Sequence, residues 1–140
     1  DPIVLKKMRL LRTYGGGTVP MPIMAASAAL LWDEKHVEAN RALYREKFDV
    51  AEEILGNQFG FYRPEGGFFL WLDVGSNGGG ETATKKLWSE AGVKVLPGAY
   101  LSRPDETGET PGSRYIRIAL VEDIEATRSA MRRIADILGK

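Results

Sequence analysis

The stretch that decides the fold lies near the end of the chain, where residues 115–120 read YIRIAL. Successive side chains of a β-strand point to opposite faces of a sheet, so Ile116, Ile118 and Leu120 share one face and Arg117 lies on the other. The pattern predicts a strand with one buried face. Arg117 fits a solvated surface arginine, because charged residues are mostly exposed. It also fits a rigid guanidinium fork that binds a carboxylate.

Two upstream segments accompany this strand. Residues 64–73 read PEGGFFLWLD, and residues 92–98 read GVKVLPG. The paired glycines of the first segment suit a turn into a buried strand, or a backbone that approaches a ligand closely. In the second case Phe68 or Phe69 would form a wall of the ligand pocket. The second segment is typical of a strand that ends in a turn.

The composition excludes several classes of protein. With 140 residues, of which 44% are hydrophobic, the chain is long enough to form one compact core. The 19 acidic and 19 basic residues balance, which argues against a protein dedicated to nucleic acid. The absence of cysteine excludes disulfides and thiolate chemistry, and His36 alone cannot supply a multi-histidine metal cluster. No apolar run approaches membrane-spanning length and no secretory pattern is seen, so we expect a cytoplasmic globular protein without metal or membrane contact.

The order of the expected elements predicts the fold class. The expected helices span residues 2–12, 24–31, 33–55, 81–91 and 122–138, and the expected strands span residues 59–63, 67–74, 93–96 and 115–121. Between the last two strands, residues 98–114 are polar and rich in proline and glycine, which predicts an exposed loop. The sequence therefore predicts an α+β fold with a short, mainly antiparallel sheet covered by helices.

The chain divides into two parts. It begins without methionine and as though inside a helix, and we interpret it as the C-terminal part of a longer protein. Residues 1–32 are expected to be a helical remnant of a larger domain, and residues 33–140 a small domain that opens with a long helix at 33–56. Because residues 21–31 are apolar nearly all round, we expect them to self-associate or to be locally disordered without a partner surface.

A glycine-rich segment, YGGGT at residues 14–18, has two interpretations. Successive backbone amides can form a nest that binds phosphate. The segment lacks the lysine of a Walker motif and does not follow a strand as GxGxxG, so a flexible linker is the commoner explanation.

Taken together, residues 64–73, 92–98 and 115–120 resemble, in this order, the C-terminal part of pyridoxal-phosphate aminotransferases of fold type I, class I/II. Residues 33–41, followed by Tyr44 and Lys47, are similar to the interdomain helix of the bacterial succinyldiaminopimelate aminotransferase group. The resemblance covers essentially the whole chain and implies a small aminotransferase C-terminal domain preceded by a remnant of the large cofactor-binding domain.

The resemblance assigns Arg117 to the arginine that holds the α-carboxylate of the amino acid substrate. It places Thr18 where family members reach across a dimer interface toward the partner's cofactor phosphate. It implies pyridoxal phosphate, an amino acid such as N-succinyl-diaminopimelate with 2-oxoglutarate as the oxoacid, a role in lysine biosynthesis, and a homodimer. The family's aldimine lysine lies upstream of the matched segment, so we expect no catalytic residue in this chain, no retained cofactor and no activity without the missing large domain.

One alternative comes from a different class of protein. The same helices and short sheet suit a freestanding α+β module that binds a small carboxylate or dimerises and does no chemistry.

Overall fold

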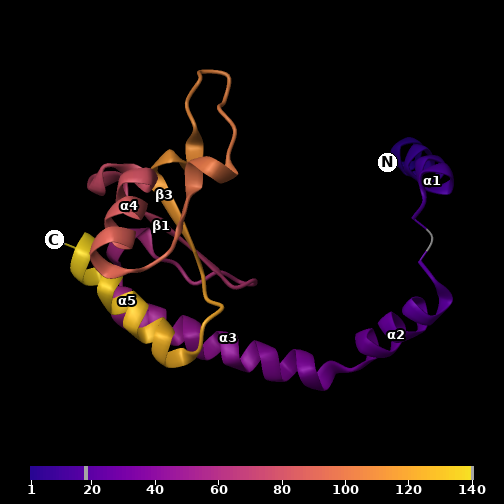
Figure 1. Cartoon of the computed structure of the whole chain (residues 1–140), viewed down its shortest axis with the longest axis horizontal. Helices are drawn as coiled ribbons and strands as arrows, with labels where there is room; N and C mark the ends of the chain where they lie inside the picture. Colours follow the sequence, from indigo (N-terminus) through magenta and orange to yellow (C-terminus); the bar gives the residue numbers. More distant parts are fainter. Residues whose placement is uncertain (18, 140) are drawn as a thin grey trace. The chain divides into compact units, whose positions relative to one another are not determined.

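The computed structural model describes residues 1–17 and 19–139 (Figure 1). It contains two compact units, Asp1–Ala39 and Asn40–Lys140. The boundary between the units lies inside helix α3, Glu34–Leu55.

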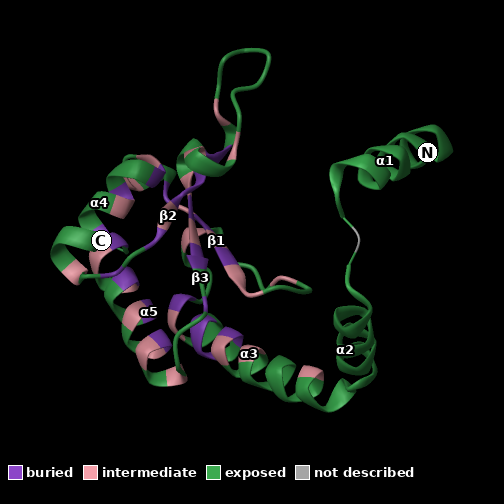
Figure 2. Ribbon diagram, turned by 45° about the vertical axis from the view of Figure 1, so that its right-hand side comes forward, coloured by how far each residue is buried: buried purple, intermediate pink, exposed green. Residues whose placement is uncertain are grey.

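The first unit is helical. Helix α1 spans Pro2–Gly15, and Asp1 caps it by accepting a hydrogen bond from the Ile3 backbone N–H at 2.7 Å. Helix α2 spans Met21–Trp32 and begins with proline in its first turn, where a backbone N–H is not needed. No residue of α1 or α2 is buried, and both are coloured as exposed in Figure 2.

The second unit is built on a three-stranded antiparallel sheet in the order β1-β3-β2. Strand β1 spans Phe69–Asp73, β3 spans Tyr115–Ala119, and β2 spans only Leu96–Pro97 at one edge. The register pairs the aliphatic side chains of β1 and β3, so one face of the sheet is apolar. The predicted α+β class and short antiparallel sheet are confirmed.

Helices pack on the apolar face of the sheet. Helix α4 spans Gly79–Ala91, α5 spans Ile124–Leu138, and the second half of α3 joins them. Asp123 caps α5 by accepting a hydrogen bond from the Ala126 backbone N–H at 2.8 Å. The strand and helix side chains that meet in this core include Leu70, Leu72, Ile116 and Ile118 from the sheet and Leu55, Leu87, Met131 and Ile134 from the helices. Figure 2 shows the buried residues gathered in these elements.

The prediction of a strand at residues 59–63 is wrong. Gln58–Gly60 form a single 3₁₀ turn, in which Phe59 has φ 56° and Gly60 has φ 60°. Two successive residues in the left-handed region turn the chain, whereas a strand requires extended backbone. Residues 61–64 that follow have no regular secondary structure.

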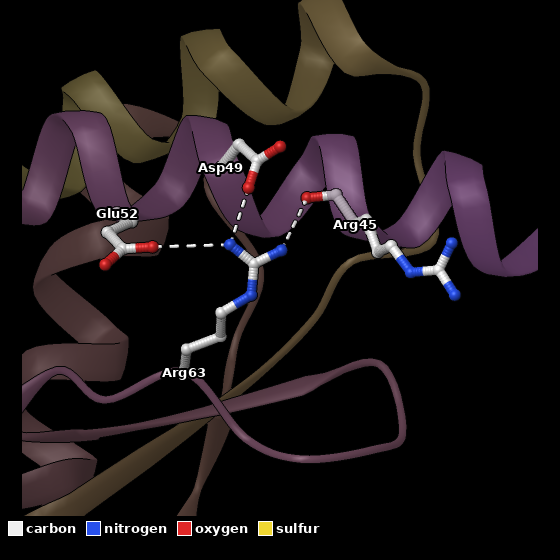
Figure 3. A network of polar contacts seen from close by, with 4 residues as sticks. All are labelled: Arg45, Asp49, Glu52 and Arg63. Carbon is white, nitrogen blue, oxygen red and sulfur yellow. Dashed lines mark hydrogen bonds and ion pairs between the residues drawn. The ribbon is translucent and has the colours of Figure 1, made fainter.

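The side chain of Arg63 fixes this irregular segment to α3 (Figure 3). Its Nη1 contacts the carboxylates of Asp49 and Glu52, the second at 3.3 Å, and its Nη2 donates to the Arg45 carbonyl at 3.2 Å. The guanidinium also lies 5.8 Å from the centre of the Phe48 ring. The chain therefore enters β1 from a defined position against the helix.

The strand predicted at residues 93–96 is observed only at Leu96–Pro97, as β2. The residues before it complete the end of α4. Gly92 adopts a left-handed conformation with φ 61°, and the Val93 backbone N–H donates to the Leu87 carbonyl at 3.1 Å. This is the hydrogen bonding of a glycine-capped helix end.

The predicted exposed loop at residues 98–114 contains two 3₁₀ turns that pack together, η3 at Gly98–Leu101 and η4 at Pro111–Arg114. A Cβ atom on Gly112 would lie 2.2 Å from the Gly98 carbonyl oxygen, so only glycine allows this approach. The residues between the two turns are mostly exposed, as the prediction required.

Candidate functional site

Four side chains on the face of the sheet opposite the core form the candidate site, which we call the open-face cluster: Phe69, Trp71, Tyr115 and Arg117. Arg117 lies on the central strand, directly opposite Trp71 of β1 and Leu96 of β2. Directly paired residues of antiparallel strands project from the same face, and all four members of the cluster are half-buried. The alternation of β3 thus places Arg117 on the face that the sequence predicted.

The guanidinium of Arg117 stacks on an aromatic ring. Its Cζ lies 4.3 Å from the centre of the Phe69 ring, within cation–π range. Among the described residues, no carboxylate forms an ion pair with Arg117. The N–H donors of this half-buried arginine therefore have no carboxylate acceptor among the described residues.

A row of aromatic rings holds Phe69 in place. The Phe69 and Phe68 ring centres are 4.2 Å apart, and Phe68 stacks on Tyr44 of α3 at 5.6 Å. Lys47 lies 4.9 Å from the Tyr44 ring centre and donates to the Leu120 carbonyl at 3.0 Å. The sequence left open whether Phe68 or Phe69 would face a ligand pocket. In the structure Phe69 contacts Arg117, and Phe68 connects Phe69 to α3.

Trp71 and Tyr115 complete the open-face cluster. Their rings meet edge to face at 75°, with centres 6.4 Å apart. Neither residue was predicted as part of the site, although the period of two along each strand places both on the same face as Arg117. The pairing of the strands, which brings them together, could not be derived from either strand alone.

Asp73, the acidic residue of β1, already has a basic partner. Arg114 binds Asp73 through two nitrogens, with Nε–Oδ1 at 3.0 Å and Nη2–Oδ2 at 2.7 Å. This pair lowers the pKa of Asp73 below its ordinary value, and a hydrogen bond from the Gly75 backbone N–H adds to the effect. Asp73 is therefore a carboxylate satisfied by Arg114 and does not occupy Arg117.

The cluster does not include Thr18, the other predicted site residue, or His36, the single histidine. Thr18, the predicted cofactor-phosphate contact, lies outside the described residues. His36 lies in the first turn of α3, where its Nδ1 is 3.1 Å from Asp33 Oδ2 and lowers the pKa of that carboxyl group. No helix of the described ranges combines the length and the apolar character that crossing a bilayer demands.

Comparison with known proteins places this geometry in context. No model of a known protein family matches the sequence. The chain is 34% identical over 135 residues to the 4-dedimethylamino-4-oxo-anhydrotetracycline transaminase OxyQ of Streptomyces rimosus, an alignment that covers 96% of this chain and 35% of OxyQ. The crystal structure of an aminotransferase from Neisseria meningitidis Z2491 superimposes with a TM-score of 0.87 and 38% identity, over 99% of this chain and 35% of that one.

The chain is similar to the C-terminal third of an aminotransferase. A structure from Thermus thermophilus, described as a probable N-succinyldiaminopimelate aminotransferase, matches with a TM-score of 0.63 and 27% identity over 79% of this chain and 28% of that one. The chain thus spans about a third of the length of the proteins that it matches.

Proposed function

We propose that this chain is the substrate-side part of a pyridoxal-phosphate-dependent aminotransferase, and that Arg117 binds the α-carboxylate of the amino acid substrate. The observation that carries the proposal is the Arg117 guanidinium on the open face of the sheet, stacked on Phe69 and without an acidic partner among the described residues. The similarity to aminotransferases over nearly the whole chain supports it.

The geometry suits this role. A guanidinium offers two parallel N–H donors to a carboxylate, and such a two-point contact fixes the direction of the bound group as well as its position. Transamination requires one bond at the substrate Cα to be held in a set orientation, so a fixed carboxylate contributes directly to the rate. Phe69 restricts the guanidinium from one side, and the rings of Trp71 and Tyr115 provide an apolar surround that strengthens an ion pair by displacing water.

The residues present do not by themselves fit pyridoxal phosphate. No strand in the described ranges carries a lysine, and Lys47 and Lys86 donate to the backbone carbonyls of Leu120 and Ile137. The proposal therefore assigns the covalent site to the missing large domain, with Thr18 as a contact to the cofactor phosphate across a homodimer interface. This chain without that domain is expected to be inactive and not to retain the cofactor.

The substrate belongs to the proposal as well. Our candidate is N-succinyl-diaminopimelate with 2-oxoglutarate as the amino acceptor, in a cytoplasmic enzyme of lysine biosynthesis. The Thermus structure described as a probable N-succinyldiaminopimelate aminotransferase supports this choice. OxyQ, which is more similar in sequence, is named for a different substrate, an oxo-anhydrotetracycline, so a substrate panel has to include both kinds of oxo compound.

The test uses the protein encoded by the complete reading frame. Replacing Arg117 with lysine keeps the charge and loses the two-point contact. We therefore expect KM to rise and kcat/KM to fall roughly 10- to 150-fold, which corresponds to a loss of about 1.5–3 kcal/mol in transition-state stabilisation. Steady-state kinetics with the amino donor measures the effect, and Arg117→Gln should lower kcat/KM further.

The matched control is Arg128→Gln, which removes an arginine of α5 that pairs with Glu53 at 3.0 Å, outside the open-face cluster. Its kcat/KM should stay close to that of the unmodified enzyme. Equal kinetics for Arg117→Lys and the control would remove Arg117 from the site. A complete protein that neither binds pyridoxal phosphate nor transfers an amino group would favour the carboxylate-binding module instead.

A further inference from the structure

A concave site lies beside the sheet edge, and Arg117 does not line it. Its volume is about 350 Å³, and it lies between helix α4 and the segment that carries β2 and η3. We call it the α4–β2 pocket; its lining residues are Glu81, Thr84, Lys85, Trp88, Lys94, Val95, Leu96, Pro97 and Tyr100. A volume of this size lies within the range of small-molecule sites.

The sequence explains how the pocket forms. Positions 81, 84, 85 and 88 are spaced by three or four residues, so they share one face of α4. Gly92 ends the helix and turns the chain back along it, which brings residues 94–97 against that face. Val95 and Pro97 are buried and form an apolar floor.

Two aromatic side chains of the pocket are uncovered. Trp88 is 61% exposed and Tyr100 is 67% exposed, although both line the same concavity. Large exposed aromatic residues at a concave site are typical of surfaces that bind a ligand, because a flat apolar group gains both burial and ring contacts there.

The charges of the pocket favour an anion. Lys85 and Lys94 line it with Glu81, so the lining carries a formal charge of +1. Neither lysine forms an ion pair or a hydrogen bond with a described residue. Thr84 also belongs to the lining, but its hydroxyl oxygen is buried and has no hydrogen-bond partner among the described residues, so the charged contacts come from the lysines alone.

We propose that the α4–β2 pocket binds a small carboxylate with a flat apolar body, which stacks between Trp88 and Tyr100 while its carboxylate meets Lys85 and Lys94. The apolar floor selects against fully hydrophilic anions, and the two free ammonium groups select against neutral analogues. None of the four residues of the open-face cluster lines the pocket, although Leu96 of its lining is paired with Arg117 in the sheet, so the two sites are neighbours with different linings.

The test titrates the full 140-residue chain with 3-phenylpropanoate and, separately, with 3-phenylpropanamide, which has the same shape without the charge. We expect the acid to shift the backbone amide resonances of residues 81–101 and the Trp88 indole N–H, with a dissociation constant on the order of 0.1–1 mM. The dissociation constant of the amide should be at least about fivefold higher than that of the acid, as expected for the loss of partly exposed ion pairs.

Matched variants locate the carboxylate contact. Lys85→Gln and Lys94→Gln should each weaken binding of the acid about two- to fivefold and leave binding of the amide unchanged. Lys86→Gln is the control, since Lys86 neighbours Lys85 on α4 but donates to the Ile137 carbonyl at 3.1 Å. Trp88→Ala should weaken both ligands and identifies the indole resonance.

Three results would overturn the proposal. Equal affinity for the acid and the amide would show that the lysines do not recognise a charge. Shifts confined to residues outside 81–101 would place the ligand elsewhere, and the absence of any shift at ligand concentrations on the order of 10 mM would show that the pocket does not bind this class of molecule.

Discussion

At the scale of single residues, the arginines of the second unit differ in what surrounds their guanidinium groups. Arg63, Arg114 and Arg128 each bind at least one carboxylate of the same chain. Arg117 has the Phe69 ring at 4.3 Å, closer than the rings beside Arg63 and Arg114 at 5.8 and 6.0 Å, and it has no carboxylate partner among the described residues. An aromatic ring restricts the motion of a guanidinium without occupying its hydrogen-bond donors, which is why our proposal gives the binding role to Arg117.

The pair of Arg114 and Asp73 predicts a dependence of stability on pH. Arg114 lowers the pKa of Asp73 in the folded chain below the ordinary value of 3.8, so the pair stabilises the fold above that pH and loses its effect as the pH falls further. Replacing Asp73 with asparagine should therefore reduce the free energy of unfolding at pH 7, and the difference from the unmodified chain should shrink below about pH 4. Urea unfolding at several pH values measures this.

The control for that experiment is Asp136→Asn. Asp136 is an exposed residue of α5 without a hydrogen bond to a described residue, so its replacement should change the free energy of unfolding little at any pH. A difference between Asp73→Asn and the unmodified chain that stayed constant from pH 7 to about pH 3 would contradict the assignment of this pair.

At the scale of secondary structure, the elements with a clear period were predicted from the sequence. The alternation around Arg117 predicted β3 and its buried face, and Gly92 predicted the end of α4. The sequence did not predict the turn at Phe59, because its left-handed backbone is unusual for an aromatic residue and depends on contacts made elsewhere in the fold. The aromatic neighbours of Arg117 were missed for a related reason, since the register between β1 and β3 is a property of the folded sheet.

The packed turns η3 and η4 give a prediction at this scale. Gly112→Ala places a methyl group 2.2 Å from the Gly98 carbonyl oxygen, so the two turns must separate. We expect a loss of about 1–3 kcal/mol in the free energy of unfolding, as for other overpacked sites. Chemical denaturation measures the loss.

A second glycine serves as the control for this substitution. A Cβ atom on Gly66 would meet nothing within 4 Å, so Gly66→Ala should change the free energy of unfolding by less than about 0.5 kcal/mol. If the two alanine variants were equally stable, the close approach of η3 and η4 would not be a constraint on the fold.

At the scale of the whole molecule, the first unit leaves a long apolar surface uncovered. Leu31 is 80% exposed and Trp32 is 87% exposed at the end of α2, a helix whose residues are otherwise almost entirely apolar. Exposed apolar surface of this extent normally meets a partner. The apolar composition of α2 predicts that this helix seeks a partner surface, and it does not identify the partner.

We expect the isolated chain to self-associate through α2. Leu31→Glu introduces a charge into the apolar surface and should shift the sedimentation velocity profile toward the monomer. Ser27→Glu, which adds the same charge at the helix's only hydroxyl-bearing residue, is the control and should disturb association less. A monodisperse monomer in which hydrogen exchange shows α2 to be ordered would contradict this expectation.

The short edge strand determines the form that such association can take. β2 consists of Leu96 and Pro97, and proline has no amide hydrogen to donate. The backbone at this border offers few donors to a further strand, so growth of the sheet through β2 is disfavoured. Any strand pairing between two copies of the chain should therefore use the opposite edge, β1, which contains no proline.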